Sequence, residues 1–272
     1  MSVTADQERS FYDGIYGRFL TLPPEDLRFD RAILTRILTD PTQPYYERRK
    51  LYQRTLAVLM AEPVAGLRVL DYGCGTGDWG LMLATEGADV TCLDLSPVAI
   101  EVVRRRAAAS GVTVRGCARD ASDLSCFADG EFDMVYGSAA LHHTLKYPGA
   151  VAELLRVLKP GGRLVLSETF GNNPLLNLAR RWRAIWHREP AEAGEEILFS
   201  QAEVAVLRAQ MKDVQLEPLN LLAMAKRMFR GRFESGAVRG VMAALESADA
   251  LLLRVAPALG RYCGEVVVQA RR

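Results

Sequence analysis

The sequence predicts a doubly wound α/β fold, in which a seven-stranded, mostly parallel sheet has helices on both faces. Two observations predict it. Between residues 67 and 168, apolar runs of strand length alternate with segments of helical periodicity. The first of these runs ends in a carboxylate and leads at once into alternating glycines and a helix-like segment, which is the order strand, tight turn, helix. In sheets of this kind a ligand lies at the carboxyl ends of the strands.

The first half of the chain contains the N-terminal segment and the first four pairs of predicted helices and strands. Residues 1–45 hold an aromatic stretch and several prolines, and they predict short helices that fold over the main domain, residues 46–272, as an N-terminal lid. Ser96 as a cap and Pro97 at the first helical position open one of the later helices. The pattern predicts strands at 67–71, 89–93, 112–116 and 132–136 and helices at 46–60, 78–86, 97–109 and 148–158.

The second half of the chain is less regular after the fifth predicted strand, residues 163–168. A loop rich in Glu, Ala and Gly separates two helices there, and a long insertion with two apolar faces follows later. The pattern predicts helices at 173–186 and 200–211 within a substrate cap of residues 171–212, a sixth strand at 214–219, a helical insertion at 221–259 and a seventh strand at 264–270.

The glycine turn after the first strand favours a ligand that carries both charges. Gly73, Gly75 and Gly77 lack a Cβ, so the backbone can adopt a positive φ and a ligand can lie directly against it. The first amides of the next helix point into the same space and favour an anion. Asp71, at the carboxyl end of the strand, suits a cation. An amino acid group meets both requirements.

Composition argues against several classes of function. The net charge is +1, so no global field attracts nucleic acid, which is not an expected partner. The five cysteines form no metal-type spacing with the three histidines, which predicts a reducing compartment and no metal site. The N-terminus has no apolar signal segment, and no run reaches about 18 apolar residues. We therefore expect a cytoplasmic protein.

Five motifs occur in order between residues 67 and 170. They are Val69–Gly77, Leu93–Ser96, Asp120–Ala121, Phe132–Ser138 with Leu141–His143, and Leu155–Gly162. Together they resemble class I S-adenosylmethionine-dependent methyltransferases, specifically the small-molecule group similar to quinone and sterol methyltransferases. The resemblance covers over a third of the chain. It implies a Rossmann-like sheet whose last strand is antiparallel.

The resemblance also implies where S-adenosylmethionine binds. Asp71 and the amides of the glycine turn are expected to hold its methionyl part, Asp94 to accept from both ribose hydroxyls, and Asp120 to accept from the adenine amino group. The sulfonium carries an activated methyl group, so the protein needs mainly to align a nucleophile and remove a proton. The expected cofactor-binding residues are Asp71, Gly73, Gly75, Gly77, Asp94, Leu95, Asp120, Ala121 and Ser138.

A dinucleotide-binding site is the competing interpretation, because Gly75, Gly77 and Gly80 satisfy the GxGxxG pattern and Asp94 lies near the expected acidic distance. The register argues against it. The strand ends at Asp71, two residues before the first glycine, and a carboxylate there would face an anionic pyrophosphate. We therefore favour S-adenosylmethionine as the cofactor.

Three residues are candidates for catalysis, in the order of preference His143, His142 and Glu168. The histidines follow the fourth strand, next to the expected methyl acceptor, where one can take a proton from a hydroxyl or amine. The alternative is that a histidine only shapes the pocket. Glu168 ends the fifth strand and either orients an acceptor group or caps a loop. The N-terminal tyrosines are candidates for the pocket mouth, although ordinary packing is the preferred interpretation for each; they are Tyr12, Tyr16, Tyr45 and Tyr46.

Two helical segments combine basic and aromatic side chains, residues 180–188 and residues 226–232 within the insertion. We expect solvated cations, with the tryptophans turned into the core. The alternative is a surface for RNA or anionic lipid, where cations meet phosphates and aromatic rings insert. Because residues 221–259 are rich in Leu, Met and Val, peripheral membrane contact through 180–188 and 221–259 fits better than RNA.

The predicted activity is methyl transfer from S-adenosylmethionine to a small-molecule or lipid-like acceptor, at oxygen in preference to nitrogen or carbon. N- or C-methylation of a natural product or quinone-like molecule is the alternative. A third hypothesis is a non-catalytic, cofactor-binding scaffold that acts through the insertion, and the intact set of Asp71, Asp94 and Asp120 argues against it. The motifs do not identify the acceptor, because acceptor pockets in this fold are built from segments outside them.

Overall fold

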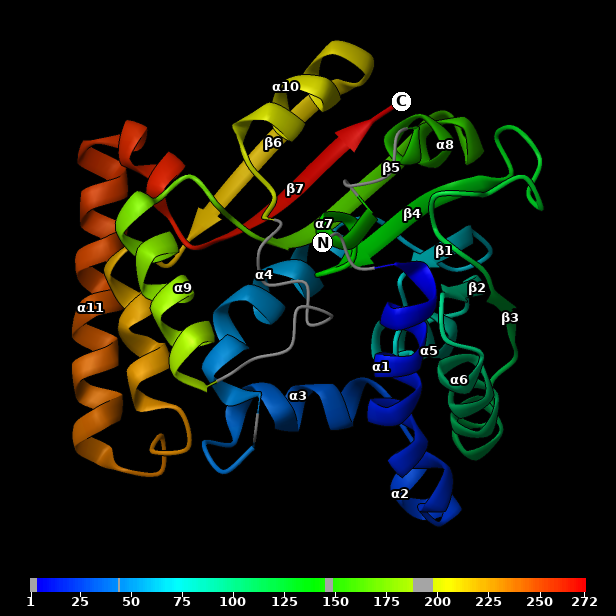
Figure 1. Cartoon of the computed structure of the whole chain (residues 1–272), viewed down its shortest axis with the longest axis horizontal. Helices are drawn as coiled ribbons and strands as arrows, with labels where there is room; N and C mark the ends of the chain where they lie inside the picture. The colour runs from blue at the N-terminus through cyan, green and yellow to red at the C-terminus, as the bar shows by residue number, and fades with distance from the viewer. Residues whose placement is uncertain (1–3, 44, 145–148, 188–197) are drawn as a thin grey trace.

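One seven-stranded sheet organises the computed structural model, which describes residues 4–43, 45–144, 149–187 and 198–272 (Figure 1). The strands are β1 (Arg68–Tyr72), β2 (Asp89–Asp94), β3 (Val114–Ala118), β4 (Phe132–Ser138), β5 (Leu158–Thr169), β6 (Lys212–Leu219) and β7 (Glu265–Arg271). Their order is β3-β2-β1-β4-β5-β7-β6. β7 is antiparallel to β5 and β6, and the other neighbours are parallel. The predicted α/β fold is confirmed.

Helices pack around this sheet, and they come before, between and after its strands in the sequence (Figure 1). Those before β1 are α1 (Ala5–Gly17), α2 (Pro24–Leu27), α3 (Arg31–Thr39) and α4 (Arg49–Leu59). Those between β1 and β5 are α5 (Asp78–Thr85), α6 (Pro97–Ser110), α7 (Leu141–Thr144) and α8 (Ala150–Val157). The later helices are α9 (Pro174–His187), α10 (Gln201–Gln210) and α11 (Gly236–Val255). Short 3-10 segments occur before β1 at η1 (Arg18–Thr21) and η2 (Tyr46–Arg48), and after β6 at η4 (Leu222–Phe229) and η5 (Pro257–Tyr262).

Two hydrophobic clusters pack on opposite faces of the sheet, and a third, smaller one lies in the helical insertion. Successive side chains of a strand point to opposite faces. In β1, Leu70 and Tyr72 therefore belong to a cluster with residues of α8 and α10, whereas Val69 belongs to a cluster with residues of α3, α4, α5 and α6. The helices thus cover both faces, and the carboxyl ends of the parallel strands stay at one edge.

Local sequence signals explain most element boundaries. The predicted cap is present, because the Ser96 hydroxyl accepts from the amide of Ala99 and Pro97 occupies the first position of α6. Strand β3 begins two residues later than predicted, since residues 112 and 113 belong to the connection that leaves α6. The start predicted at residue 148 and most of the loop predicted after α9 lie outside the described residues.

The helical insertion is fixed to the last strand by buried polar contacts. Lys226 of η4 donates to both carboxylate oxygens of Glu265 in β7, at 2.8 and 2.7 Å. Burial lowers the pKa of Lys226, and the Lys226 ammonium lowers the pKa of Glu265 against the effect of burial. Asp249 of α11 accepts from the amides of Leu221 and Leu222 at 2.9 and 2.7 Å and so caps the start of η4. The insertion is a packed part of the fold.

The expectation for the tryptophans of α9 is wrong. Trp182 and Trp186 are 65% and 77% exposed, whereas Arg180 is buried. The Arg180 guanidinium donates to the carbonyl oxygens of Phe170 and Gly264, at 3.2 and 3.3 Å. The inward face of α9 lies against the end of β5 and the start of β7. There the arginine adds hydrogen bonds to these carbonyls, one of which also accepts from the amide of Phe170, and the rings turn outward. In the described part of the chain, no helix is long and apolar enough to cross a bilayer.

Candidate active site

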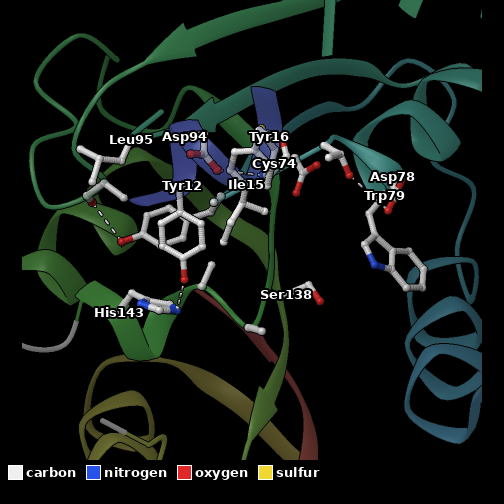
Figure 2. Close-up of a pocket in the computed structure, with 18 of the residues that line it drawn as sticks. Tyr12, Ile15, Tyr16, Cys74, Asp78, Trp79, Asp94, Leu95, Ser138 and His143 are labelled. Atoms are coloured by element: carbon white, nitrogen blue, oxygen red, sulfur yellow. Dashed lines mark hydrogen bonds between the residues drawn. The ribbon is translucent and has the colours of Figure 1, made fainter. Parts of the chain in front are cut away.

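A cavity of about 340 Å³ lies where the carboxyl ends of β1, β2 and β4 meet helix α1. The chain runs from β1 to β2 on one side of β1, while β4 pairs with its other side, so the cavity lies at the topological switch point of the sheet. Figure 2 shows Tyr12, Ile15 and Tyr16 projecting from α1 into this space, opposite Ser138 and His143. A cavity is therefore present at the position where the ligand was predicted to bind.

The glycine turn forms the floor of the cavity. Gly73 and Gly75 have φ values of +67° and +52°, where a Cβ would be strained. A Cβ on Gly73 would lie 2.4 Å from the Cβ of Ala140, and a Cβ on Gly75 would lie 3.1 Å from the Tyr16 hydroxyl. Gly77 does not line the cavity. Its φ of +75° starts α5, and a Cβ there would lie 2.8 Å from a methyl group of Val103 in α6.

Asp71 is a buried carboxylate at the edge of the cavity. One oxygen accepts from the amide of Gly80 at 2.9 Å, and the side chain is 2% exposed. Burial raises the pKa of Asp71 to about 7. A Cβ on Gly80 would lie 2.7 Å from the same oxygen, so the third glycine of the GxGxxG pattern makes room for this carboxylate. Asp71 thus offers an acceptor whose charge is unbalanced until a cation approaches.

Asp94 holds the turn together from the end of β2. Its two oxygens accept from the amides of Gly75 and Ser96, at 2.8 and 2.9 Å. Burial raises its pKa despite these bonds. Asp120, in the loop after β3, accepts from the amide of Ser122 at 2.8 Å and also lines the cavity. Leu95, Ala121 and Ser138 lie on the same wall.

His143 is the histidine on the cavity wall, and two side chains of α1 hold it. Its Nδ1 lies 2.9 Å from a carboxylate oxygen of Glu8, and its Nε2 lies 3.3 Å from the hydroxyl of Tyr12 (Figure 2). The Tyr12 ring also packs edge-on against the imidazole, with centroids 5.8 Å apart. An imidazole with a carboxylate on one nitrogen and a hydroxyl on the other is arranged for proton transfer at the second.

The structure corrects the assignment of His142 and Glu168, because neither lines the cavity. Glu168 is fully buried, accepts from the amides of Ala140 and Leu141 at 3.2 and 2.9 Å, and contacts Nδ1 of His142 at 2.7 Å. The loop after β4 folds back over the end of β5, so this carboxylate lies beneath the start of α7. Glu168 therefore caps the loop, the alternative that its position left open, and His142 packs below His143.

Sequence reasoning missed several residues of the wall. Tyr12, Tyr16 and Tyr45 line the cavity, whereas Tyr46 packs against Phe233 at 5.5 Å instead. A helical spacing of four, three and one would have found Glu8 and Ile15, since these positions share one face of α1 with Tyr12 and Tyr16. The wall residues that were not predicted include Glu8, Ile15, Arg18, Phe19, Tyr52, Thr76, Asp78 and Trp79.

Comparison with known proteins identifies this arrangement. Residues 69–162 match a family model described as a methyltransferase domain. The chain contains a class I S-adenosylmethionine-dependent methyltransferase domain. The matched residues run from β1 to β5, which is the part of the sheet whose carboxyl ends form the cavity.

The methyltransferase domain has relatives in quinone biosynthesis. It is 39% identical over 140 residues to a demethylmenaquinone methyltransferase of Clavibacter sepedonicus, which is 52% of this chain and 56% of that protein. It is 38% identical over 104 residues to a ubiquinone biosynthesis O-methyltransferase of Xanthomonas euvesicatoria, which is 38% of this chain and 44% of that protein. The chain therefore spans about half the length of these relatives.

Solved structures share the fold of the methyltransferase domain. The [4+2]-cyclase SpnF aligns over 100% of this chain and 97% of its own, with a TM-score of 0.62 and 22% identity. A putative methyltransferase from Bacillus halodurans aligns over 79% of this chain and 97% of its own, with a TM-score of 0.53 and 19% identity. At these identities the likeness concerns architecture.

The residues around the cavity fit S-adenosylmethionine. The ligand carries an ammonium group, ribose hydroxyls and an adenine amino group, which all donate hydrogen bonds. The carboxylates of the wall include Asp71, Asp94 and Asp120, and the first two are buried without a basic partner in contact among the described hydrogen bonds and ion pairs. The glycine turn leaves open backbone where a Cβ would intrude. Donors on the ligand match acceptors on the protein.

Proposed function

We propose that this chain methylates an oxygen atom of a small, flat, quinol-like acceptor, with His143 as the general base. The observation that carries the proposal is the placement of His143 on the cavity wall, with Nδ1 held by Glu8 and Nε2 next to the Tyr12 hydroxyl. A hydroxyl becomes a good nucleophile when a neighbouring base takes its proton, and a histidine suits this task near neutral pH.

The residues of the chain divide the work. Asp71 and the glycine turn would hold the methionyl part, Asp94 the ribose hydroxyls, and Asp120 with Ala121 the adenine. When bound, S-adenosylmethionine supplies the activated methyl group. Nε2 of His143 then takes the proton of the acceptor hydroxyl while the acceptor oxygen forms its bond to the methyl carbon, so that the carbon–sulfur bond breaks and its electrons stay on sulfur.

The wall also indicates the class of acceptor. Several aromatic side chains line the cavity, with Tyr12, Phe19, Tyr45 and Tyr52 among them. Aromatic rings pack well against a planar ring, and the tyrosine hydroxyls can meet a polar substituent. The names of the two quinone-pathway relatives support an acceptor of this chemistry. N- or C-methylation of a related molecule is the alternative outcome.

Calorimetry and a methyl-transfer assay test the proposal. We expect S-adenosylmethionine and its demethylated product to bind, nicotinamide dinucleotides to give no heat, and a catechol or quinol to gain one methyl group on oxygen. Dinucleotide binding in place of S-adenosylmethionine would refute the cofactor assignment. Binding without transfer to any phenol, amine or activated carbon tested would favour the non-catalytic scaffold hypothesis instead.

The affinity for S-adenosylmethionine should increase with pH through neutrality. The pKa of Asp71 is raised to about 7, so the carboxyl is protonated below that pH and charged above it. A cationic methionyl group prefers the charged form, and calorimetry should show about tenfold tighter binding at pH 8 than at pH 6. Asp71→Asn keeps an oxygen for the amide of Gly80 but cannot ionise, so its pH dependence should be flatter. An equally steep profile in this variant would assign the effect to another group, such as Asp94.

We also propose that α9 contacts an anionic lipid surface. Its exposed apolar side chains recur at helical spacing on one face, and no acidic residue occurs in the helix. Arg181 is exposed beside them. Tryptophan and arginine together suit the boundary between headgroups and acyl chains. The exposed face consists of Leu175, Leu178, Trp182, Ile185 and Trp186.

Vesicle co-sedimentation tests the lipid surface. Replacing Trp182 and Trp186 together by Ala should weaken binding to phosphatidylglycerol vesicles by about tenfold or more, because two large apolar side chains leave the interface. Val206→Ala on α10 removes an exposed apolar side chain elsewhere and should have no effect. Equal sedimentation of the tryptophan variant and the unaltered chain would make α9 a surface of another kind.

The division into an N-terminal lid, residues 1–45, and a substrate cap, residues 171–212, remains a prediction. The cytoplasmic setting remains a prediction as well.

A further inference from the structure

Glu8 is a buried carboxylate that the motifs of the methyltransferase domain do not account for. It lies in the first helix, far from those motifs in sequence, and is 5% exposed. Its carboxylate oxygen lies 2.9 Å from Nδ1 of His143. The contact with His143 gives this buried carboxylate a hydrogen-bonding partner on the cavity wall.

The spacing along α1 places Glu8 in the same wall as the aromatic side chains. Glu8, Tyr12 and Tyr16 follow one another at intervals of four, and Ile15 lies beside them, so all four share one face of the helix. All four line the cavity, and Figure 2 shows the tyrosines and Ile15 projecting into it from the helix. The face of α1 that lines the cavity thus carries one carboxylate, Glu8, and this carboxylate contacts the ring of His143.

We propose that Glu8 is the positioning residue of His143: its carboxylate fixes the imidazole with the proton on Nδ1, which leaves Nε2 unprotonated and directed at the acceptor. The proposal rests on the function proposed above. In a neutral imidazole one nitrogen donates and the other accepts, and a carboxylate can only accept, so the contact selects one tautomer. The Tyr12 hydroxyl, 3.3 Å from Nε2, then donates to the nitrogen that an acceptor hydroxyl would use.

The neighbouring histidine cannot take this role. Nδ1 of His142 contacts Glu168, and that pair is buried beneath α7, off the cavity wall. The ring centroids of His142 and His143 are 4.3 Å apart, so the His142–Glu168 pair packs against the side of the His143 ring. The two histidine–carboxylate pairs therefore have different roles. One organises the loop after β4, and the other controls the nitrogen that faces the cavity.

The same helix also contacts the cofactor side of the cavity. Asp13 of α1 accepts from the hydroxyl of Ser96, the residue whose amide bonds to Asp94. Tyr16 lies over Gly75, at the turn expected to hold the methionyl group. Helix α1 therefore contributes to two parts of the cavity. Asp13 and Tyr16 contact the part expected to hold the cofactor, and Glu8 contacts His143.

Nitrogen-15 NMR of the full chain, labelled at histidine, tests the proposal. The chain has three histidines, so the signals of His143 are identified by their absence in His143→Gln. At alkaline pH, where the rings are neutral, we expect His143 to be mainly the Nδ1–H tautomer. Glu8→Leu should lower the ratio of Nδ1–H to Nε2–H by about tenfold, the value of one charge-assisted hydrogen bond. Glu8→Gln keeps an acceptor oxygen but loses the charge, so its ratio should lie between those of the unaltered chain and Glu8→Leu.

Two controls separate the contact from general effects. Asp6→Leu changes an exposed carboxylate on the same helix and should leave the ratio unchanged, and Glu168→Gln should alter the signals of His142 alone. An Nε2–H ring in the unaltered chain overturns the proposal whatever the variants do, and so does an unchanged ratio in Glu8→Leu. Calorimetry distinguishes the two failures: a chain that does not bind S-adenosylmethionine refutes the proposed function, whereas binding combined with an Nε2–H ring refutes the role of Glu8 alone.

Discussion

Asp94→Asn should weaken binding of S-adenosylmethionine by about 100-fold or more, as measured by calorimetry. The carboxylate accepts from the amides of Gly75 and Ser96 with its two oxygens, and its remaining acceptor capacity faces the cavity where the ribose is expected. An Asn side chain has one acceptor oxygen and one NH₂ group, so one of these two amides would face a donor. Loss of a charge-assisted bond to the turn and of the ribose contact each costs about 1.5–3 kcal/mol.

The control for Asp94→Asn lies on the same strand. Asp89 begins β2 at the opposite edge of the sheet and is exposed, so Asp89→Asn removes the same charge without touching the turn. Its affinity should stay within about twofold of the unaltered chain, as is usual for surface substitutions. If Asp94→Asn bound S-adenosylmethionine as tightly as Asp89→Asn does, the ribose would have to lie elsewhere in the cavity.

His143→Gln should lower kcat by about 100-fold or more with an accepted phenolic substrate, while the affinity for S-adenosylmethionine changes by less than about threefold. General base catalysis contributes about 10²–10⁴ to a rate, and glutamine can hydrogen-bond without taking a proton. The decrease should appear in single-turnover methyl transfer, where neither cofactor binding nor product release contributes to the rate.

A matched substitution defines the specificity of this effect. Lys159 lies at the other end of β5, is exposed, and pairs with Asp133, so Lys159→Gln should leave kcat unchanged within about twofold. Full turnover in His143→Gln would show that the acceptor ionises without help from this ring. The histidine would then only shape the cavity, the alternative that the sequence left open.

The cofactor side of the cavity was predictable because its residues are consecutive or follow strand ends. Asp71, Asp94 and Asp120 come directly after or at the ends of β1, β2 and β3, and parallel strands bring their carboxyl ends to one edge. The expected cofactor residues other than Gly77 therefore lie on one wall. Gly77 differs because a positive φ at the start of α5 and the packing against Val103 need a glycine for reasons of local geometry alone.

The catalytic side was less predictable because its contacts join distant parts of the chain. Glu8 and His143 are separated by most of the methyltransferase domain, and no spacing rule connects them. Glu168 was placed near the acceptor because it ends a strand, but the loop after β4 folds over it. The tryptophans of α9 were expected inside because they are apolar, yet Arg180 occupies the inward face and donates to the carbonyls of Phe170 and Gly264. Tertiary hydrogen bonding decided each of these cases.

Helix α1 also bears on the kinetics expected of the reaction. It lines the cavity and contacts both the glycine turn and the ring of His143, so a ligand bound there would lie against the helix. At Gly14 and Gly17 an added Cβ would meet nothing within 4 Å, so these two positions of the helix are not packed against a neighbour. We expect the contacts with α1 to lengthen the residence time of the demethylated product, so that product release, and not methyl transfer, limits turnover.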